Sequence, residues 1–174
     1  GEWATTTFGA GKKNKKEIFN EIRYPHSLGL LYSAFTYFLG FEVNSGEYKL
    51  MGLAPFGQPK YFDLIINNLI NVKDDGSFIL NQVYFNYSVG LTMTNHKFSK
   101  LFNIKRRNPS DELSQIHMDI AASIQRALEY IVIKICKHVK KITNMKKLCL
   151  SGGVALNCVA NYKIGLEKIF DEIW

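Results

Sequence analysis

The chain has 174 residues, of which 47% are hydrophobic and 21% are charged, a balance that excludes a disordered chain and allows a domain with a real core. The net charge is +7, from 22 basic and 15 acidic residues, but most basic residues are lysines spread over several segments, so we expect solvated faces and no nucleic-acid partner. We see no apolar stretch that could span a bilayer and no signal peptide, which predicts a cytoplasmic protein without membrane contact.

The first 40 residues predict a hairpin followed by a helix. Residues 3–8 are rich in β-branched and aromatic side chains and lead into glycines, and residues 17–24 are expected to return as a second strand. After Pro25, apolar residues recur at spacings of three and four and predict a helix from Ser27 to Gly40.

The next segment predicts short elements. We expect Ser45 to cap a helix that runs through Leu53, and residues 62–72 to form another helix. An Asp-Asp-Gly turn then leads into a strand at residues 77–80. Residues 81–108 show no clear period and are expected to be irregular, with a short helix near His96.

The last segment predicts a long helix and then a strand, a loop, a helix and a strand. The long helix is expected to start at residues 109–112, with acidic residues in its first turn, and to end near Asn144. Residues 147–150 and 170–174 are expected to be strands, with a helix over residues 156–166 between them. This order indicates an α/β fold.

The side chains in the sequence form no recognisable catalytic set. The four histidines have no metal-ligand spacing, and the three cysteines include no CxxC pair, which favours reduced thiols. Asp119 and Gln125, on the long helix, are expected to be buried polar anchors. We therefore assign no catalytic residue and no metal ligand.

A strand, a glycine pair and a helix start follow one another at Gly152 and Gly153. Such a loop leaves helix N–H groups open to an anion, and Asn157 in the first turn could face a sugar or a base. Neither the GxGxxG nor the GK[ST] fingerprint is present. The pattern alone leaves a plain turn and a ligand loop equally open.

Five ordered motifs resemble one family. They are GEWATTTFGAG, YPHSLGLLYSAFTYFLGF, VNSGEYKLMGLAPFG, DIAASIQRALE and LCLSGGVALNCVANYKI. Together they look like the NodU-like carbamoyltransferases, with residues 58–109 less distinctive. A wider relation is to the TsaD-like tRNA threonylcarbamoyladenosine transferases.

The resemblance implies a fold and a domain organisation. The expected fold is one lobe of the actin-like or RNase H-like fold that hexokinase, actin and heat-shock ATPases share. Residues 1–174 would be a single fragment, the second lobe of an ATP-binding domain, with the first 11 residues in its phosphate-facing hairpin. A smaller domain resembling the YrdC fold would lie elsewhere in a longer protein.

The resemblance also implies a reaction and site residues. Enzymes of this kind form carbamoyl-adenylate from carbamoyl phosphate and ATP, and transfer the carbamoyl group to a hydroxyl of a small-molecule acceptor. Nucleotide-binding roles carry over to Gly152, Gly153 and Asn157, and to Glu47 and Lys49, where a carboxylate suits ribose and an ammonium suits phosphate. A divalent metal, iron or magnesium, is expected in the full-length enzyme, with ligands outside these residues, so the fragment alone should be inactive.

Two other interpretations remain open. One is a TsaD-like tRNA-modifying enzyme, although the SGEYKLMGLAPFG stretch argues against it. The other is a non-catalytic, actin-like binding module. The acceptor and the oligomeric state cannot be predicted from these residues.

Overall fold

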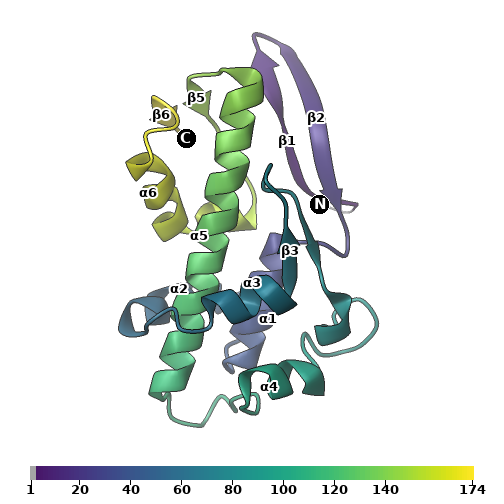
Figure 1. The fold of residues 1–174 in the computed structure, drawn as a ribbon, viewed down its shortest axis with the longest axis vertical. Coiled ribbons are helices and arrows are strands. Elements are labelled where there is room, and N and C mark those ends of the chain that lie inside the picture. Colours follow the sequence, from purple (N-terminus) through teal and green to yellow (C-terminus); the bar gives the residue numbers. More distant parts are fainter. Residues whose placement is uncertain (1–2) are drawn as a thin grey trace. The chain divides into compact units, whose positions relative to one another are not determined.

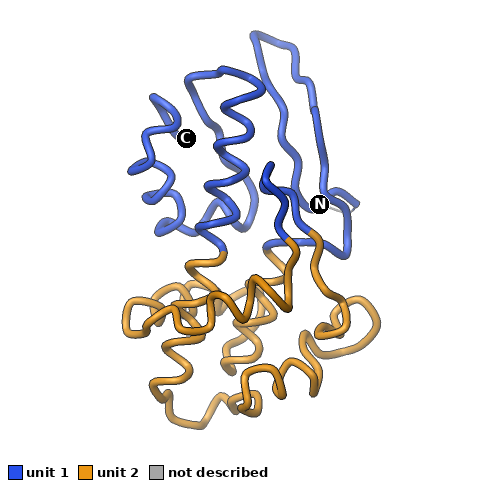
Figure 2. Tube along the Cα trace, viewed as in Figure 1, with its two compact units in different colours: residues 1–28, 72–78, 128–174 blue, residues 29–71, 79–127 orange. Residues whose placement is uncertain are grey.

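The computed structural model describes residues 3–174 (Figure 1). The chain divides into two compact units (Figure 2). Unit 1 contains residues 1–28, 72–78 and 128–174, and unit 2 contains residues 29–71 and 79–127. One of the boundaries between the units falls within the longest helix, after Ala127.

The described residues form helices and three two-stranded sheets, so the predicted mixed α/β character is confirmed. The helices are α1 Leu28–Phe38, α2 Glu47–Leu53, α3 Phe62–Asn68, α4 His96–Phe102, α5 Gln115–Thr143 and α6 Cys158–Leu166. The strands are β1 Ala4–Lys12, β2 Lys15–Arg23, β3 Ile70–Val72, β4 Phe78–Leu80, β5 Lys147–Leu148 and β6 Glu172–Ile173. Short 3-10 turns are η1 Ala54–Phe56, η2 Gln82–Tyr84 and η3 Gly153–Leu156.

In unit 1 the predicted hairpin and the final strand–loop–helix–strand order are both confirmed. β1 and β2 pair antiparallel, while β5 and β6 pair in parallel, as expected when a helix connects two neighbouring strands. Phe8 of β1 packs against a buried cluster of apolar side chains from α5, α6 and the segment before β6. The buried members of this cluster are Cys136, Val139, Ile164 and Phe170.

All three cysteines are free thiols, in agreement with the sequence. Burial raises the pKa of the Cys136 thiol to about 11, so this thiol stays protonated and unreactive at neutral pH.

The core of unit 2 is a cluster of aromatic rings between α1 and α4. Phe35 and Phe38 of α1 meet Phe98 and Phe102 of α4 with ring centroids 4.8 to 5.9 Å apart. The predicted helix near His96 is confirmed, and Asn95 caps it by accepting from the N–H groups of Lys97 and Phe98. These contacts hold α1 in place, and α1 carries part of the candidate site.

The predicted helix over residues 62–72 is wrong at its carboxyl end. The helix ends at Asn68, and residues 70–72 form β3, which pairs with β4. The reason is the turn that follows, where the N–H of Lys73 donates to the carbonyl of Ser77 at 2.8 Å. A hairpin turn next to β-branched residues is more favourable here than another helical turn.

The predicted start of the long helix at residues 109–112 is also wrong, because α5 begins at Gln115 and has no acidic residue in its first turn. The Arg107 guanidinium donates to the carbonyls of Pro109 and Asp111. These bonds hold the preceding segment in a turn. The predicted end is confirmed, since Asn144 adopts a left-handed conformation after the last turn and its N–H donates to the carbonyl of Lys140.

Candidate functional site

The glycine loop lies between β5 and α6, as predicted, and both glycines are exposed. Gly152 has φ 102° and ψ 177°, a conformation that favours glycine, and its carbonyl accepts from the N–H of Ala155. Gly153 has no such constraint. A Cβ added at Gly153 would meet no heavy atom within 4 Å. The backbone turn therefore explains Gly152, whereas nothing within the described chain requires glycine at position 153.

The sequence predicted that Asn157 lies in the first turn of α6. In the structure Asn157 is the N-cap, one position before the helix. Its Oδ1 accepts from the N–H of Ala160 at 2.9 Å, and the residue is only 8% exposed. The side-chain oxygen is therefore engaged in starting the helix. A contact between Asn157 and a ribose or base stays a prediction.

Glu47 is the first residue of α2 and is half-buried. Its Oε1 accepts two hydrogen bonds, from Ser33 Oγ at 2.7 Å and from the N–H of Asn44 at 3.0 Å. Ser45, predicted to cap this helix, does not do so, since the N-cap is Gly46 and no side chain caps the helix there. The Glu47 carboxylate instead bonds to the segment that precedes the helix.

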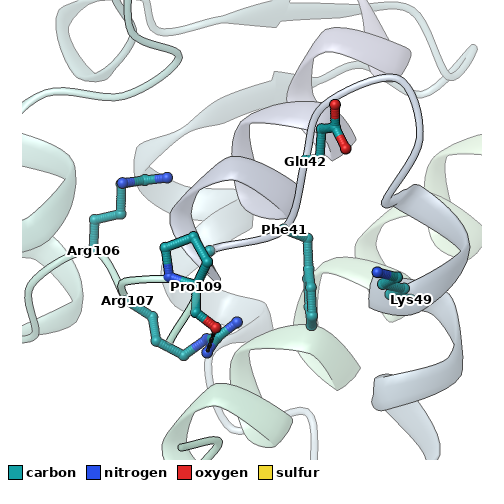
Figure 3. A pocket seen from close by; sticks show the side chains of 7 residues that line it. Phe41, Glu42, Lys49, Arg106, Arg107 and Pro109 are labelled. Carbon is teal, nitrogen blue, oxygen red and sulfur yellow. Dashed lines mark hydrogen bonds between the residues drawn. The ribbon is translucent and has the colours of Figure 1, made fainter. Parts of the chain in front are cut away.

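Lys49 is exposed and lines a pocket of about 470 Å³ within unit 2. The other labelled side chains of this pocket are Phe41, Glu42, Arg106, Arg107 and Pro109 (Figure 3). In that view Lys49 lies on one side of the Phe41 ring and the two arginines on the other. Glu47 does not line the pocket. This agrees with helix geometry, because side chains two positions apart do not face each other.

The basic residues were expected to lie on solvated faces, and for Arg107 this expectation is wrong. Arg107 is only 7% exposed, and its Nε donates to the carbonyl of Leu39 at 2.7 Å. Arg106 is half-buried, its Nε donates to the carbonyl of Tyr37 at 2.9 Å, and its guanidinium lies 4.0 Å from the centre of the Tyr37 ring. The two adjacent arginines could have indicated this burial in the sequence. A planar guanidinium donates to several carbonyls and stacks on aromatic rings, which an ammonium does less well.

The five predicted site residues thus fall into two groups. Glu47 and Lys49 belong to unit 2, whereas Gly152, Gly153 and Asn157 belong to unit 1. That both groups contact one nucleotide stays a prediction.

The residues that were expected to act as buried anchors do so. Asp119 is 3% exposed and accepts from the N–H of Gln58, while Gln125 is 5% exposed and accepts from the Tyr32 hydroxyl at 2.9 Å. Among residues 3–174, no three His, Cys, Asp or Glu side chains group as a metal site. The divalent metal was expected to have its ligands outside these residues, so it stays a prediction, and we assign no chemical step to it.

None of the helices in the described part of the chain has both the length and the apolar character that a membrane span requires.

Comparison with known proteins identifies the family. All of residues 1–174 match the family model described as carbamoyltransferase N-terminus. A Synechocystis protein named uncharacterized protein sll1178 is 58% identical over the whole chain, which covers 28% of that protein. Nodulation protein NolNO of Sinorhizobium fredii is 33% identical over the whole chain, which covers 24% of it. Nodulation protein NolO of Bradyrhizobium diazoefficiens is 36% identical over 86% of the chain, and the matched region covers 25% of NolO.

The chain thus spans about a quarter of the length of the curated relatives it matches. The resemblance drawn from the five motifs is confirmed, and the chain belongs to the carbamoyltransferase N-terminus family.

Proposed function

We propose that this chain is the nucleotide-binding part of an ATP-dependent O-carbamoyltransferase. In this proposal the enzyme forms carbamoyl-adenylate from carbamoyl phosphate and ATP, and transfers the carbamoyl group to a hydroxyl of a small-molecule acceptor. Family membership supports the transfer of a carbamoyl group. The use of ATP and the adenylate are expectations from the resemblance.

The observation that carries the proposal is the open backbone at Gly153. Gly153 is exposed, and its surroundings leave room for a side chain. Glycine at such a position leaves the backbone open to close contact with a ligand. Residues 153–156 form a 3-10 turn that leads directly into α6, so backbone N–H groups are concentrated at this point. Phosphate oxygens are acceptors that such donors bind well.

Lys49 and Glu47 are proposed to contribute from α2. No carboxylate forms an ion pair with Lys49 among residues 3–174, so its ammonium is available to a phosphate. Glu47 offers a carboxylate to the ribose. In this proposal the chain binds and orients the nucleotide, which is a large part of what acyl transfer from an adenylate requires.

The test is a substitution that adds bulk at Gly153 without disturbing the fold. Gly153→Val in the complete gene product should abolish ATP binding measured by calorimetry, because the new side chain would occupy the space that the phosphates need. Gly165→Val is the matched control, since Gly165 on α6 is also exposed and has no heavy atom within 4 Å of an added Cβ. Equal ATP affinity in wild type and Gly153→Val, with cooperative unfolding in both, would remove the nucleotide from this loop.

A further inference from the structure

The hydroxyl of Ser33 on α1 forms a hydrogen bond to a residue of another helix and not to the backbone of α1. Ser33 is 8% exposed, and its Oγ donates to Oε1 of Glu47 on α2 at 2.7 Å. A serine within a helix commonly bonds back to the carbonyl four residues earlier. Thr36, one turn further along the same helix, does this, since its Oγ1 donates to the carbonyl of Tyr32 at 3.0 Å. The hydroxyls of Ser33 and Thr36 therefore bind different partners, one on α2 and one on α1 itself.

Both hydrogen bonds to Glu47 end on the same oxygen. Ser33 Oγ and the N–H of Asn44 both donate to Oε1. Among the described residues, no hydrogen bond or ion pair is made to Oε2. Glu47 is half-buried, and Oε2 is not among the fully buried side-chain atoms without a partner in the described chain, so this second oxygen is accessible to a ligand.

Two donors on one oxygen hold a carboxylate in a defined orientation. The side chain of a first-turn glutamate otherwise samples several rotamers, and fixing it before a ligand arrives reduces the entropy lost on binding. An ionised carboxylate only accepts hydrogen bonds. Oε2 of Glu47 is thus suited to hydroxyl donors, and an adjacent pair of hydroxyls on a sugar matches its lone pairs.

We propose that Ser33 is a positioning residue for Glu47, and that the pair sets the preference of the site for a nucleotide with an intact ribose. This inference rests on the proposed function, because it takes Glu47 to be the ribose contact. It adds a residue from α1 that lies 14 positions before Glu47. In this inference Glu47 binds the ribose through Oε2 alone.

A purely structural tie between α1 and α2 predicts a different result. If the Ser33–Glu47 bond only holds the helices together, its loss weakens binding of every nucleotide to the same degree. If it positions Glu47, its loss affects a ribose more than a deoxyribose. The ratio of the two affinities separates these outcomes, whatever happens to overall stability.

The experiment measures binding of ATP and 2′-deoxy-ATP by calorimetry to the complete gene product. The variants are Ser33→Ala, Glu47→Gln and the control Thr36→Val, which removes a buried hydroxyl from the same helix without touching Glu47. Wild type should prefer ATP, and the preference should fall about tenfold in Ser33→Ala, the size expected when a hydrogen bond to a charged group is lost. Glu47→Gln should abolish the preference, and Thr36→Val should keep it.

The outcomes separate this inference from the function on which it rests. ATP binding by wild type with an unchanged preference in Ser33→Ala would overturn the role of Ser33 and leave the nucleotide site intact. Equal affinity of wild type for ATP and 2′-deoxy-ATP would overturn the ribose contact of Glu47. Failure of wild type to bind ATP at all would overturn the proposed nucleotide site, and this inference with it. Thermal unfolding of each variant identifies any loss of binding that comes from misfolding.

Discussion

Asp119 carries its charge at a position that is only 3% exposed. Its Oδ1 accepts from the N–H of Gln58 and from the amide of Gln115, both at 2.9 Å, and its Oδ2 accepts from Lys60 Nζ at 2.7 Å. Burial by itself raises the pKa of Asp119, but these bonds and the Lys60 charge outweigh it and lower the pKa from 3.8 to about 2. The carboxylate therefore anchors the segment after α2 to α5, a role in stability rather than in chemistry.

This anchor predicts a loss of stability in acid. Because the folded pKa of Asp119 lies below the unfolded value, its contribution is complete above about pH 4 and is lost as the pH falls toward 2. The shift corresponds to about 2 kcal/mol in the free energy of unfolding. Asp119→Asn should cost about this much at pH 7, and the difference from wild type should shrink as the pH falls.

Urea titration of the chain at pH 7, 4 and 2.5 measures this difference. Asp63→Asn serves as the control, because Asp63 is an exposed carboxylate of the same unit and its substitution should change stability by less than about 0.5 kcal/mol. A difference between Asp119→Asn and wild type that stays constant across this pH range would mean that the carboxylate charge does not stabilise the fold.

At the scale of elements, the η1 turn after α2 lies directly against the backbone of α5. A Cβ added at Gly57 would lie 2.0 Å from the carbonyl oxygen of Met118. Glycine at this position therefore allows the close approach through which Gln58 reaches Asp119. The glycine of the APFG stretch is explained by packing between these elements, without a ligand.

Two glycine substitutions of opposite effect test this packing. Gly57→Ala should destabilise the chain by more than about 2 kcal/mol, because backbone atoms have to move to accommodate the methyl group. Gly52→Ala, on the exposed face of α2 where an added Cβ meets nothing within 4 Å, should stabilise it by up to about 1 kcal/mol. Thermal unfolding of both variants gives the comparison, and a Gly57→Ala variant as stable as wild type would disprove the close approach.

The elements that sequence predicted well are those set by local pattern. The hairpin at the start and the helix that carries Phe35 follow from side-chain periodicity, which neighbouring residues determine. The start of α5 was missed where a distant group acts. Arg107 is held by the carbonyl of Leu39, 68 positions earlier in the chain, and its guanidinium also donates to the carbonyls of Pro109 and Asp111 in the turn before α5.

The same limit applies to the candidate site. Glu47 and Lys49 were predicted because a motif carries them, whereas Ser33 was missed because a single serine in an apolar helix has no pattern of its own. Its partner is 14 residues away on another helix, so only the folded chain shows the pair. The open backbone at Gly153 was predicted, but its distinction from Gly152 required the backbone angles.

At the scale of the whole molecule, ion pairs lower the number of unpaired lysines. Among the described residues, five lysines lie within 4.0 Å of a carboxylate: Lys60, Lys134, Lys137, Lys146 and Lys147. Most of these pairs are exposed and add little to stability. They nevertheless place a negative charge beside each of these lysines while the net charge stays +7, so the lysines form a weaker surface for a polyanion than their number indicates.

This charge distribution separates the carbamoyltransferase proposal from the tRNA-modifying alternative. A tRNA-modifying enzyme needs specific binding that persists at physiological salt, whereas scattered cations give only nonspecific binding that falls steeply as salt rises. We expect the complete gene product to bind fluorescent tRNA weakly at 50 mM KCl and to lose that binding at 200 mM KCl in anisotropy titrations. A single-stranded DNA of equal charge is the control, and it should behave in the same way, since phosphates alone are recognised. Saturable binding of tRNA at 200 mM KCl, without binding of the DNA, would require a recognition surface and would favour the tRNA-modifying alternative over a small-molecule acceptor.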